Sequence, residues 1–346
     1  MTRPLSILDL CPIEAGSTSR VALHNSEVLV QRADELGYTR YWFAEHHNSI
    51  GLASGSPEIM IAHIANKTSR IRVGSGGVML PNHAPLRIAE AFHLLESLHP
   101  SRIDLGLGRA PGTDTLTAYA LRRSEEAIRT DQYPELLSEL LALDSHGFPD
   151  DHPFRRISVT PADVNLPPIW LLGSSDFSGQ FAANSGLGFS FASHINFRAA
   201  VPVMRIYRER FKPSEYRSEP HSILAVGVVV GETEEHAAEL SKIVAVSWAA
   251  LASGRPYQPP TLAEAQRTVL SPIEQHHAQE RLNNLLIGDA ASVADQMHDL
   301  AERCQADEVM FTTSLPNLED RLRAVNSLAK AWGLPAALGI TPAAAG

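Results

Sequence analysis

The stretch Tyr-Thr-Arg-Tyr-Trp-Phe-Ala-Glu-His-His, residues 38–47, is the strongest indication of the fold. Its run of aromatic and apolar residues is typical of a parallel strand that is buried on both faces. The run stops abruptly at Glu45, His46 and His47, which would lie at the carboxyl end of that strand. In α/β barrels this edge carries the chemistry, and unpaired polar groups are costly to bury. These three side chains are therefore the first candidates for a functional site.

Further apolar runs of the same kind alternate with helical patterns along the chain. The clearest helix has Ile88, Ala91, Phe92 and Leu95 on one face. Strands that alternate with helices over short connections predict a parallel sheet with right-handed crossovers. The eight expected strands lie near residues 5, 40, 73, 104, 170, 189, 226 and 310. Eight such units predict an α/β protein with a single closed (β/α)8 TIM barrel.

Two segments interrupt this alternation. Residues 145–168 are rich in proline and are expected to form an excursion, such as a hairpin outside the barrel. Residues 255–279 are polar and also rich in proline, and they are interpreted as a long mobile loop or lid. Residues 285–288 form either a short strand or a turn. The barrel is expected to span residues 1–335, followed by a disordered tail at 336–346.

Composition narrows the class of protein. The formal net charge of −10 argues against nucleic-acid binding, which usually requires a basic face. The two cysteines, Cys11 and Cys304, do not make a disulfide framework, so a reducing cytoplasm is expected. No signal peptide is apparent at the start, and no apolar run approaches the length of a membrane span.

The adjacent histidines His46 and His47 allow three interpretations. They form a hydrogen-bonded structural pair, they bind a metal, or one of them transfers protons near neutral pH. Neighbouring side chains on a strand point to opposite faces, and the chain has no His-Glu-x-x-His or Cys-x-x-Cys motif. Zinc is therefore weakly supported, and we assign no metal ligands.

A glycine-rich stretch, Gly74-Ser75-Gly76-Gly77, falls inside an expected strand. Glycines in such a position mark a kink or bulge, or else the close approach of a backbone or a ligand. This stretch alone favours neither interpretation.

Three serines, Ser174, Ser175 and Ser178, lie where a strand gives way to a helix. Their hydroxyls and the free N–H groups of the helix suit a phosphate, although N-capping alone explains one or two of them. Arg109, at the end of another expected strand, supplies the opposing charge or forms an ordinary surface ion pair. A phosphate and a flat ring in a glycine-lined pocket suggest flavin mononucleotide (FMN).

Four stretches of the chain together resemble the bacterial luciferase-like monooxygenases. They are Leu-Gly-Tyr-Thr-Arg-Tyr-Trp-Phe-Ala-Glu-His-His (36–47), Arg-Val-Gly-Ser-Gly-Gly-Val-Met-Leu-Pro-Asn-His-Ala-Pro (72–85), Ser-Arg-Ile-Asp-Leu-Gly-Leu-Gly-Arg (101–109) and Ala-Asp-Glu-Val-Met-Phe (306–311). Arg87 and Glu90 follow the second stretch at the spacing of that family. The resemblance implies one (β/α)8 barrel with inserted segments and a reaction that uses flavin.

The resemblance also implies a role for individual residues. His46 matches the catalytic histidine, which Glu45 and His47 would orient. Gly76 and Gly77, with Ser75 beside them, fall where the family has a non-prolyl cis peptide behind the flavin ring. The phosphate-binding positions correspond to Arg109, Ser174, Ser175 and Ser178, although luciferases have a glutamate in place of Ser174. His194 lies where the family approaches the edge of the ring.

The implied reaction needs a separate reductase that delivers reduced FMN. This flavin reacts with O₂ to form a C4a-peroxyflavin, which transfers one oxygen atom to a small organic substrate that the sequence does not identify. A lid at residues 255–279 would exclude water. The chain has no Gly-x-Gly-x-x-Gly at a strand–helix turn for nicotinamide binding. Relatives pair through the second and third helices, so a homodimer is expected by analogy.

Three other functions stay open at this stage. The same family contains hydride-transfer oxidoreductases that use the deazaflavin F420. The acidic tail of F420 would favour a more basic pocket. The family also contains flavin-binding barrels without activity, against which the Glu45-His46-His47 cluster speaks. A metal-dependent barrel hydrolase is the third alternative.

Overall fold

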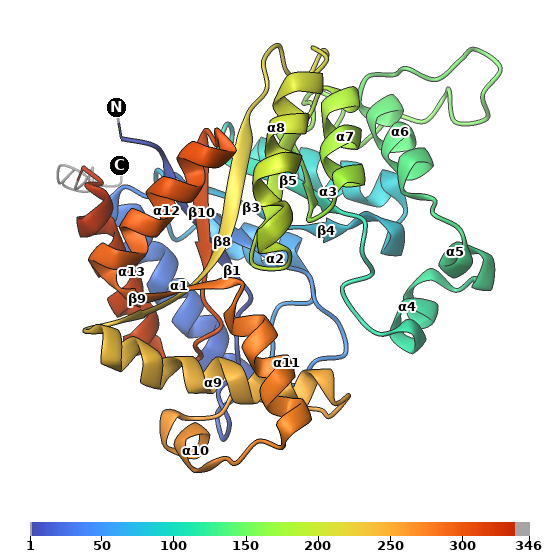
Figure 1. Ribbon diagram of the computed structural model, residues 1–346. Coiled ribbons are helices and arrows are strands. Elements are labelled where there is room, and N and C mark those ends of the chain that lie inside the picture. Colours follow the sequence, from blue (N-terminus) through green and yellow to red (C-terminus); the bar gives the residue numbers. More distant parts are fainter. Residues whose placement is uncertain (1, 336–346) are drawn as a thin grey trace, which may run out of the picture.

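Eight parallel strands close into a barrel in the computed structural model, which describes residues 2–335 (Figure 1). The last strand pairs with the strand at residues 222–231 and with the first strand, which closes the ring. The barrel strands are β1 (Leu5–Asp9), β2 (Arg40–Phe43), β3 (Arg72–Ser75), β5 (Ile103–Gly108), β6 (Ile169–Gly173), β7 (Gly188–Ala192), β8 (Ser222–Gly231) and β10 (Glu308–Thr312). The predicted (β/α)8 barrel is confirmed. The tail predicted for residues 336–346 lies outside the described residues.

Helices surround the barrel, and capping residues set where they begin and end. For example, the Thr18 hydroxyl accepts from the Val21 N–H at the start of the first helix, and Gly37 ends it with a left-handed φ of 82°. The helices around the barrel include α1 (Ser19–Leu36), α2 (Pro57–Ala65), α3 (Pro85–Leu98), α6 (Tyr133–Asp144), α7 (Asp176–Ser185), α8 (Ala200–Arg210), α12 (Ala290–Cys304) and α13 (Leu318–Trp332). Within residues 2–335, no helix is long and apolar enough to cross a membrane.

The strand expected near residue 73, which was to contain Gly74–Gly77, is instead broken at the Gly76–Gly77 peptide bond, which is cis as the resemblance implied. After this break the chain continues as β4 (Val78–Met79), which pairs with β5, and a 3₁₀ turn, η1 (Leu80–Asn82). A Cβ atom on Gly76 would lie 2.5 Å from Leu8 Cδ1, and one on Gly77 would lie 2.7 Å from the Gly106 carbonyl oxygen. Both glycines are therefore required by close packing within the barrel wall.

The inserted segments differ from expectation. Residues 255–279 are not one long loop, because they contain α10 (Leu262–Arg267) and part of α11 (Pro272–Leu282), which each begin with a capping box. Both pack with α9 (Glu234–Ala252) at one end of the molecule (Figure 1). Residues 145–168 contain no strand, so the predicted hairpin is wrong.

Two smaller additions complete the fold. Residues 285–288 belong to a strand, β9 (Leu285–Asp289), which pairs with the carboxyl half of β8 beyond the barrel. Helices α4 (Thr115–Arg122) and α5 (Glu125–Arg129) follow β5 and protrude to one side (Figure 1).

The barrel interior is layered from its amino end to its carboxyl end. The outward side chains of the strands join the main core with the helices, and a separate apolar cluster fills the inside. This inner cluster includes Leu8, Trp42, Trp170, Ile223 and Met310. Residues two positions earlier on these strands therefore form the layer below, because side chains alternate across a strand.

The layer below is a buried ionic network around Arg40. Its guanidinium donates to Glu308 at 2.7 and 2.8 Å and to Asp104 at 2.9 Å. Arg72 donates to the other oxygen of Asp104 at 2.7 Å. Burial raises the pKa of the Asp104 carboxyl, but Arg40 and Arg72 outweigh this effect and hold it below its usual value. The amino end of the barrel is thus closed by paired charges.

Replacing Arg40 by methionine should lower the free energy of unfolding by about 3–5 kcal/mol, because two buried carboxylates lose their shared partner. Urea unfolding would measure the change. The matched control is Arg129→Met, which breaks an exposed ion pair with Glu125 and should cost less than about 1 kcal/mol. Equal losses for the two variants would contradict the role given to this network.

Candidate active site at the carboxyl end of the barrel

His46 extends the inward-facing positions of β2. Trp42 and Ala44 belong to the inner cluster, and the alternation of the strand continues to His46. The backbone N–H of His46 donates to the Ser54 carbonyl oxygen at 3.1 Å, while its ring Nδ1 is buried and has no partner within residues 2–335. Burial lowers the pKa of the ring, opposed by the charge of Glu45. At neutral pH, His46 is therefore a neutral imidazole with a free ring nitrogen.

Glu45 is fully buried and holds the surrounding loop together. Its carboxylate accepts from the Met79 N–H at 2.8 Å and lies 2.7 Å from His47 Nε2. It also lies 2.9 and 3.0 Å from His83 Nε2. Burial raises the pKa of Glu45, but the bonds and charge of His83, together with His47 and Met79, lower it overall. Glu45 is thus ionised at neutral pH.

His83 is a residue that the sequence analysis did not single out. Burial lowers the pKa of its ring, but Glu45 outweighs burial and raises it. Among residues 2–335, neither Glu45 nor His47 makes a side-chain hydrogen bond to His46. Any orientation of His46 by its neighbours therefore acts through the backbone. The signal for His83 was its place in the Pro-Asn-His-Ala-Pro stretch, directly after η1 and four residues after Met79, which donates to Glu45.

His194 follows β7 and lies near His46. Its Nδ1 is 3.4 Å from the Ala225 carbonyl oxygen, and its own carbonyl oxygen accepts from Arg281. Burial lowers the pKa of His194 to about 4, and the charges of Arg281 and His46 act in the same direction. His194 is consequently neutral and joins the same mouth of the barrel.

The four residues predicted to bind phosphate come together at the start of α7. The Arg109 guanidinium lies 4.5 Å from the ring centre of Phe177, in the first turn of that helix, and pairs with Asp131 at 3.2 Å. Ser175 and Ser178 form a capping box, and the Ser174 carbonyl oxygen accepts from Asn196. Arg109 is half-exposed, so a ligand can reach it.

Ser75 is placed differently from the other predicted cofactor residues. Its hydroxyl donates to the Gly106 carbonyl oxygen at 2.8 Å and accepts from the Gly106 N–H at 2.9 Å. This side chain therefore ties β3 to β5 beside the Gly76–Gly77 break. Within residues 2–335, no three His, Cys, Asp or Glu side chains gather in an arrangement that could hold a metal ion.

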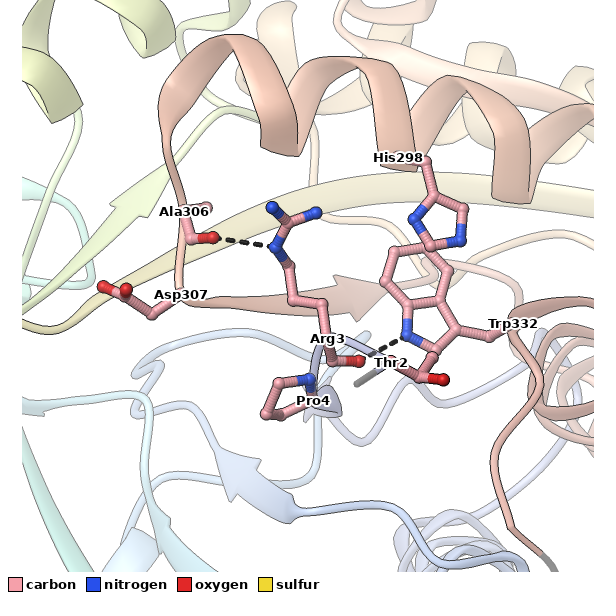
Figure 2. A pocket seen from close by; sticks show the side chains of 7 residues that line it. All are labelled: Thr2, Arg3, Pro4, His298, Ala306, Asp307 and Trp332. Carbon is pink, nitrogen blue, oxygen red and sulfur yellow. Dashed lines mark hydrogen bonds between the residues drawn. The ribbon is translucent and has the colours of Figure 1, made fainter.

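A cavity of about 870 Å³ lies at the opposite end of the barrel. Pro4 precedes β1 there and Asp307 precedes β10. Figure 2 shows that Arg3 Nε donates to the Ala306 carbonyl oxygen and that the Trp332 indole donates to the Arg3 carbonyl oxygen. The His298 ring stacks on this indole. We assign no site to it.

Comparison with known proteins identifies relatives over nearly the whole chain. The family model for luciferase-like monooxygenases matches residues 5–307. A luciferase-like monooxygenase of Escherichia coli strain K12 is 38% identical over 321 residues, which cover 93% of this chain and 94% of the relative. The N-acetyl-S-alkylcysteine monooxygenase of Bacillus subtilis strain 168 is 33% identical, with 92% and 94% covered.

Solved structures share the barrel. The crystal structure of apo-MsnO8 has a TM-score of 0.87 at 32% identity and covers 97% of this chain and 100% of that one. The oxygenating constituent of 3,6-diketocamphane monooxygenase from Pseudomonas putida, in complex with FMN, has a TM-score of 0.69 at 16% identity, with 96% and 98% covered. An F420-dependent secondary alcohol dehydrogenase also reaches 0.69, at 12% identity, with 96% and 99% covered. These last two show the shared fold alone.

NMR titration should show that the pKa values of the histidines at the mouth increase from His194 through His46 to His83. We expect His194 at about 4, His46 below 6.5 and His83 above 6.5. Glu45→Gln should lower the pKa of both His83 and His46, because the charge of Glu45 raises both. Folding raises the pKa of His83 and lowers that of Glu45. The stability that this pair contributes is therefore lost when the pH rises through the folded-state pKa of His83, and also when it falls through the folded-state pKa of Glu45. A wild-type His83 that titrates below His46 would refute this arrangement.

Proposed function

The chain belongs to the luciferase-like monooxygenase family and is a flavin-dependent monooxygenase, and from this premise we propose that it uses reduced FMN, supplied by a separate reductase, to oxygenate a small organic substrate. The observation that carries the proposal is the buried, unpaired Nδ1 of His46 at the carboxyl end of the barrel. A buried polar atom without a partner is costly unless a ligand supplies one.

The upper inward layer of the barrel suits a flat ring. The inward side chains of this layer include the small residues Ala44, Ala192 and Ala225, together with the apolar Leu10 and Leu172. An isoalloxazine ring would rest against this layer, near His46. Its phosphate would reach the start of α7, where Arg109, Ser174, Ser175 and Ser178 meet free N–H groups of the helix.

When bound, reduced FMN supplies activation of O₂ and the transfer of one oxygen atom to the substrate, the other leaving as water. His46 would hold or move the proton at Nδ1, since its ring is neutral at working pH. The Glu45–His83–His47 cluster fixes the loop that presents His46.

The segment before α10 would exclude water from this site. The Pro259 carbonyl oxygen accepts from Ala15 at 2.8 Å, and Gln258 donates to the Ile50 carbonyl oxygen. Residues 255–261 therefore cover the loops that leave β1 and β2.

Two of the alternative functions have less support. An F420-dependent dehydrogenase shares the fold, but the acidic tail of that cofactor is disfavoured by a net charge of −10. A barrel that only stores flavin does not need the buried, unpaired histidine. FMN is therefore the cofactor we propose.

We also propose a homodimer in the cytoplasm. Helices α2 and α3 carry exposed Ile59, Leu94 and Leu98, apolar side chains that a partner subunit would cover. Cys11 and Cys304 are both buried and unbonded, which suits a reducing compartment.

Anaerobic titration tests the cofactor. We expect reduced FMN to bind more tightly than oxidised FMN or F420, and O₂ then to be consumed with formation of an oxygenated product when organosulfur and carbonyl compounds are screened. Arg109→Ala should weaken FMN binding by about fivefold to tenfold and leave riboflavin binding unchanged, because only FMN carries the phosphate. Arg123→Ala, another exposed arginine, is the control.

Other outcomes of that titration have definite meanings. Binding of F420 alone would replace oxygenation by hydride transfer. Equal losses of FMN and riboflavin in Arg109→Ala would exclude a phosphate contact at this residue.

His46→Ala should retain flavin binding and lower the single-turnover oxygenation rate by about 10²–10⁴-fold, because proton transfer at the ring is lost. Rapid mixing of O₂ with the enzyme, reduced FMN and substrate measures this rate. His24→Ala removes an exposed histidine of α1 and should have no effect. An unchanged rate in His46→Ala would remove the catalytic role.

A further inference from the structure

Arg281, near the end of α11, reaches the mouth of the barrel. One of its terminal nitrogens donates to the His194 carbonyl oxygen, and its guanidinium lies 4.8 Å from the ring centre of Trp248 on α9. Its charge acts on His194, which also responds to the charge of His46. The guanidinium and the proposed catalytic ring thus border the same space.

This guanidinium lacks the carboxylate partner that the two fully buried arginines have. Arg40 pairs with Glu308 and Asp104, and Arg321 pairs with Asp9. Within residues 2–335, Arg281 forms no ion pair, and its Nε is buried without any hydrogen-bond partner. Burial lowers the pKa of Arg281, opposed by Tyr257, which means that the cation is short of solvent. A buried charge in this state is costly unless a ligand completes its surroundings.

The neighbours of Arg281 also suit an organic ligand rather than bulk water. Trp248 and Tyr257 supply half-buried aromatic surface beside the charge. At β10, the Thr312 hydroxyl is likewise buried without a partner in the described chain, and the register partner of Thr312, Gly227, lies beside His194, to which Arg281 donates. A cation, two aromatic rings and an unpaired hydroxyl are the elements of a site for a molecule with one anionic group and an apolar body.

We propose that Arg281 is a specificity-determining residue that binds an anionic group, such as a carboxylate, on the substrate of this enzyme. The inference rests on the proposed function, because it places that substrate beside His46. A guanidinium binds a carboxylate through two parallel hydrogen bonds, and here one terminal nitrogen is already committed to His194. The free Nε and its neighbouring terminal nitrogen are the pair that would contact the anion.

Isothermal titration of the full-length protein with octanoate and 1-octanol tests the subsite without knowledge of the substrate. The two probes share their alkyl chain and differ in charge. We expect wild-type protein to bind octanoate at least about tenfold more tightly than octanol, since hydrogen bonds to charged groups are strong. Arg281→Met should abolish this preference, and Arg281→Lys should retain part of it, because the charge remains while the two-point contact is lost.

Arg267→Met is the matched control, because it removes an exposed arginine from α10 in the same inserted segment. It should leave the preference for octanoate unchanged. The Lys variant guards against loss of folding, which circular dichroism of both Arg281 variants would reveal.

The possible failures point to different causes. Equal binding of octanoate and octanol by wild-type protein, or a preference that survives in Arg281→Met, would overturn the proposal. An Arg281→Met variant that loses affinity for FMN but not for riboflavin would also overturn it, because the arginine would then hold the cofactor phosphate. A wild-type preference for octanoate that depends on Arg281, in a protein that binds no FMN, would support the subsite and overturn the proposed function alone.

Discussion

The barrel depends on the neutralisation of two carboxylates buried on its axis, Asp104 of β5 and Glu308 of β10. Each would be too costly to bury alone, and Arg40 of β2 bridges them with hydrogen bonds of 2.7–2.9 Å. Because these residues come from strands far apart around the ring, their pairing fixes the strands across the interior as well as along the wall. The same network fills the amino end of the barrel, so ligands must approach from the other end.

Above this charged layer, the interior of the barrel becomes apolar. Trp42 and Trp170 pack edge to face at 5.8 Å in the middle layer, and the next layer holds Ala44 and Ala225 beside Leu10 and Leu172. Packing requires the glycine at position 76, since a side chain there would meet Leu8.

The sequence predicted the eight barrel strands because each is a short apolar run between clear helical patterns. It did not predict α10 and α11, because Pro256, Pro259 and Pro260 suggested a loop. The capping boxes at the start of each helix were the signal that could have predicted them. Ser75 was assigned to the cofactor from its motif. In the structure its hydroxyl forms hydrogen bonds with the backbone of Gly106 on the neighbouring strand. Arg281 was beyond sequence reasoning, because its lack of a carboxylate partner depends on which segments pack around it.

At the mouth of the barrel, Glu45 has charge partners and Arg281 has none within the described residues. This difference links the binding of a substrate to the proton affinity of His194. On one side, the charge of Glu45 is shared with His83 and His47. On the other, burial lowers the pKa of His194, and the charge of Arg281 lowers it further. If an anionic substrate pairs with Arg281, it removes that repulsion, so the proton affinity of His194 rises only while the site is filled. The imidazole beside His46 would then gain basicity when the substrate is present, which couples the readiness of the site for proton transfer to the binding of the molecule that needs it.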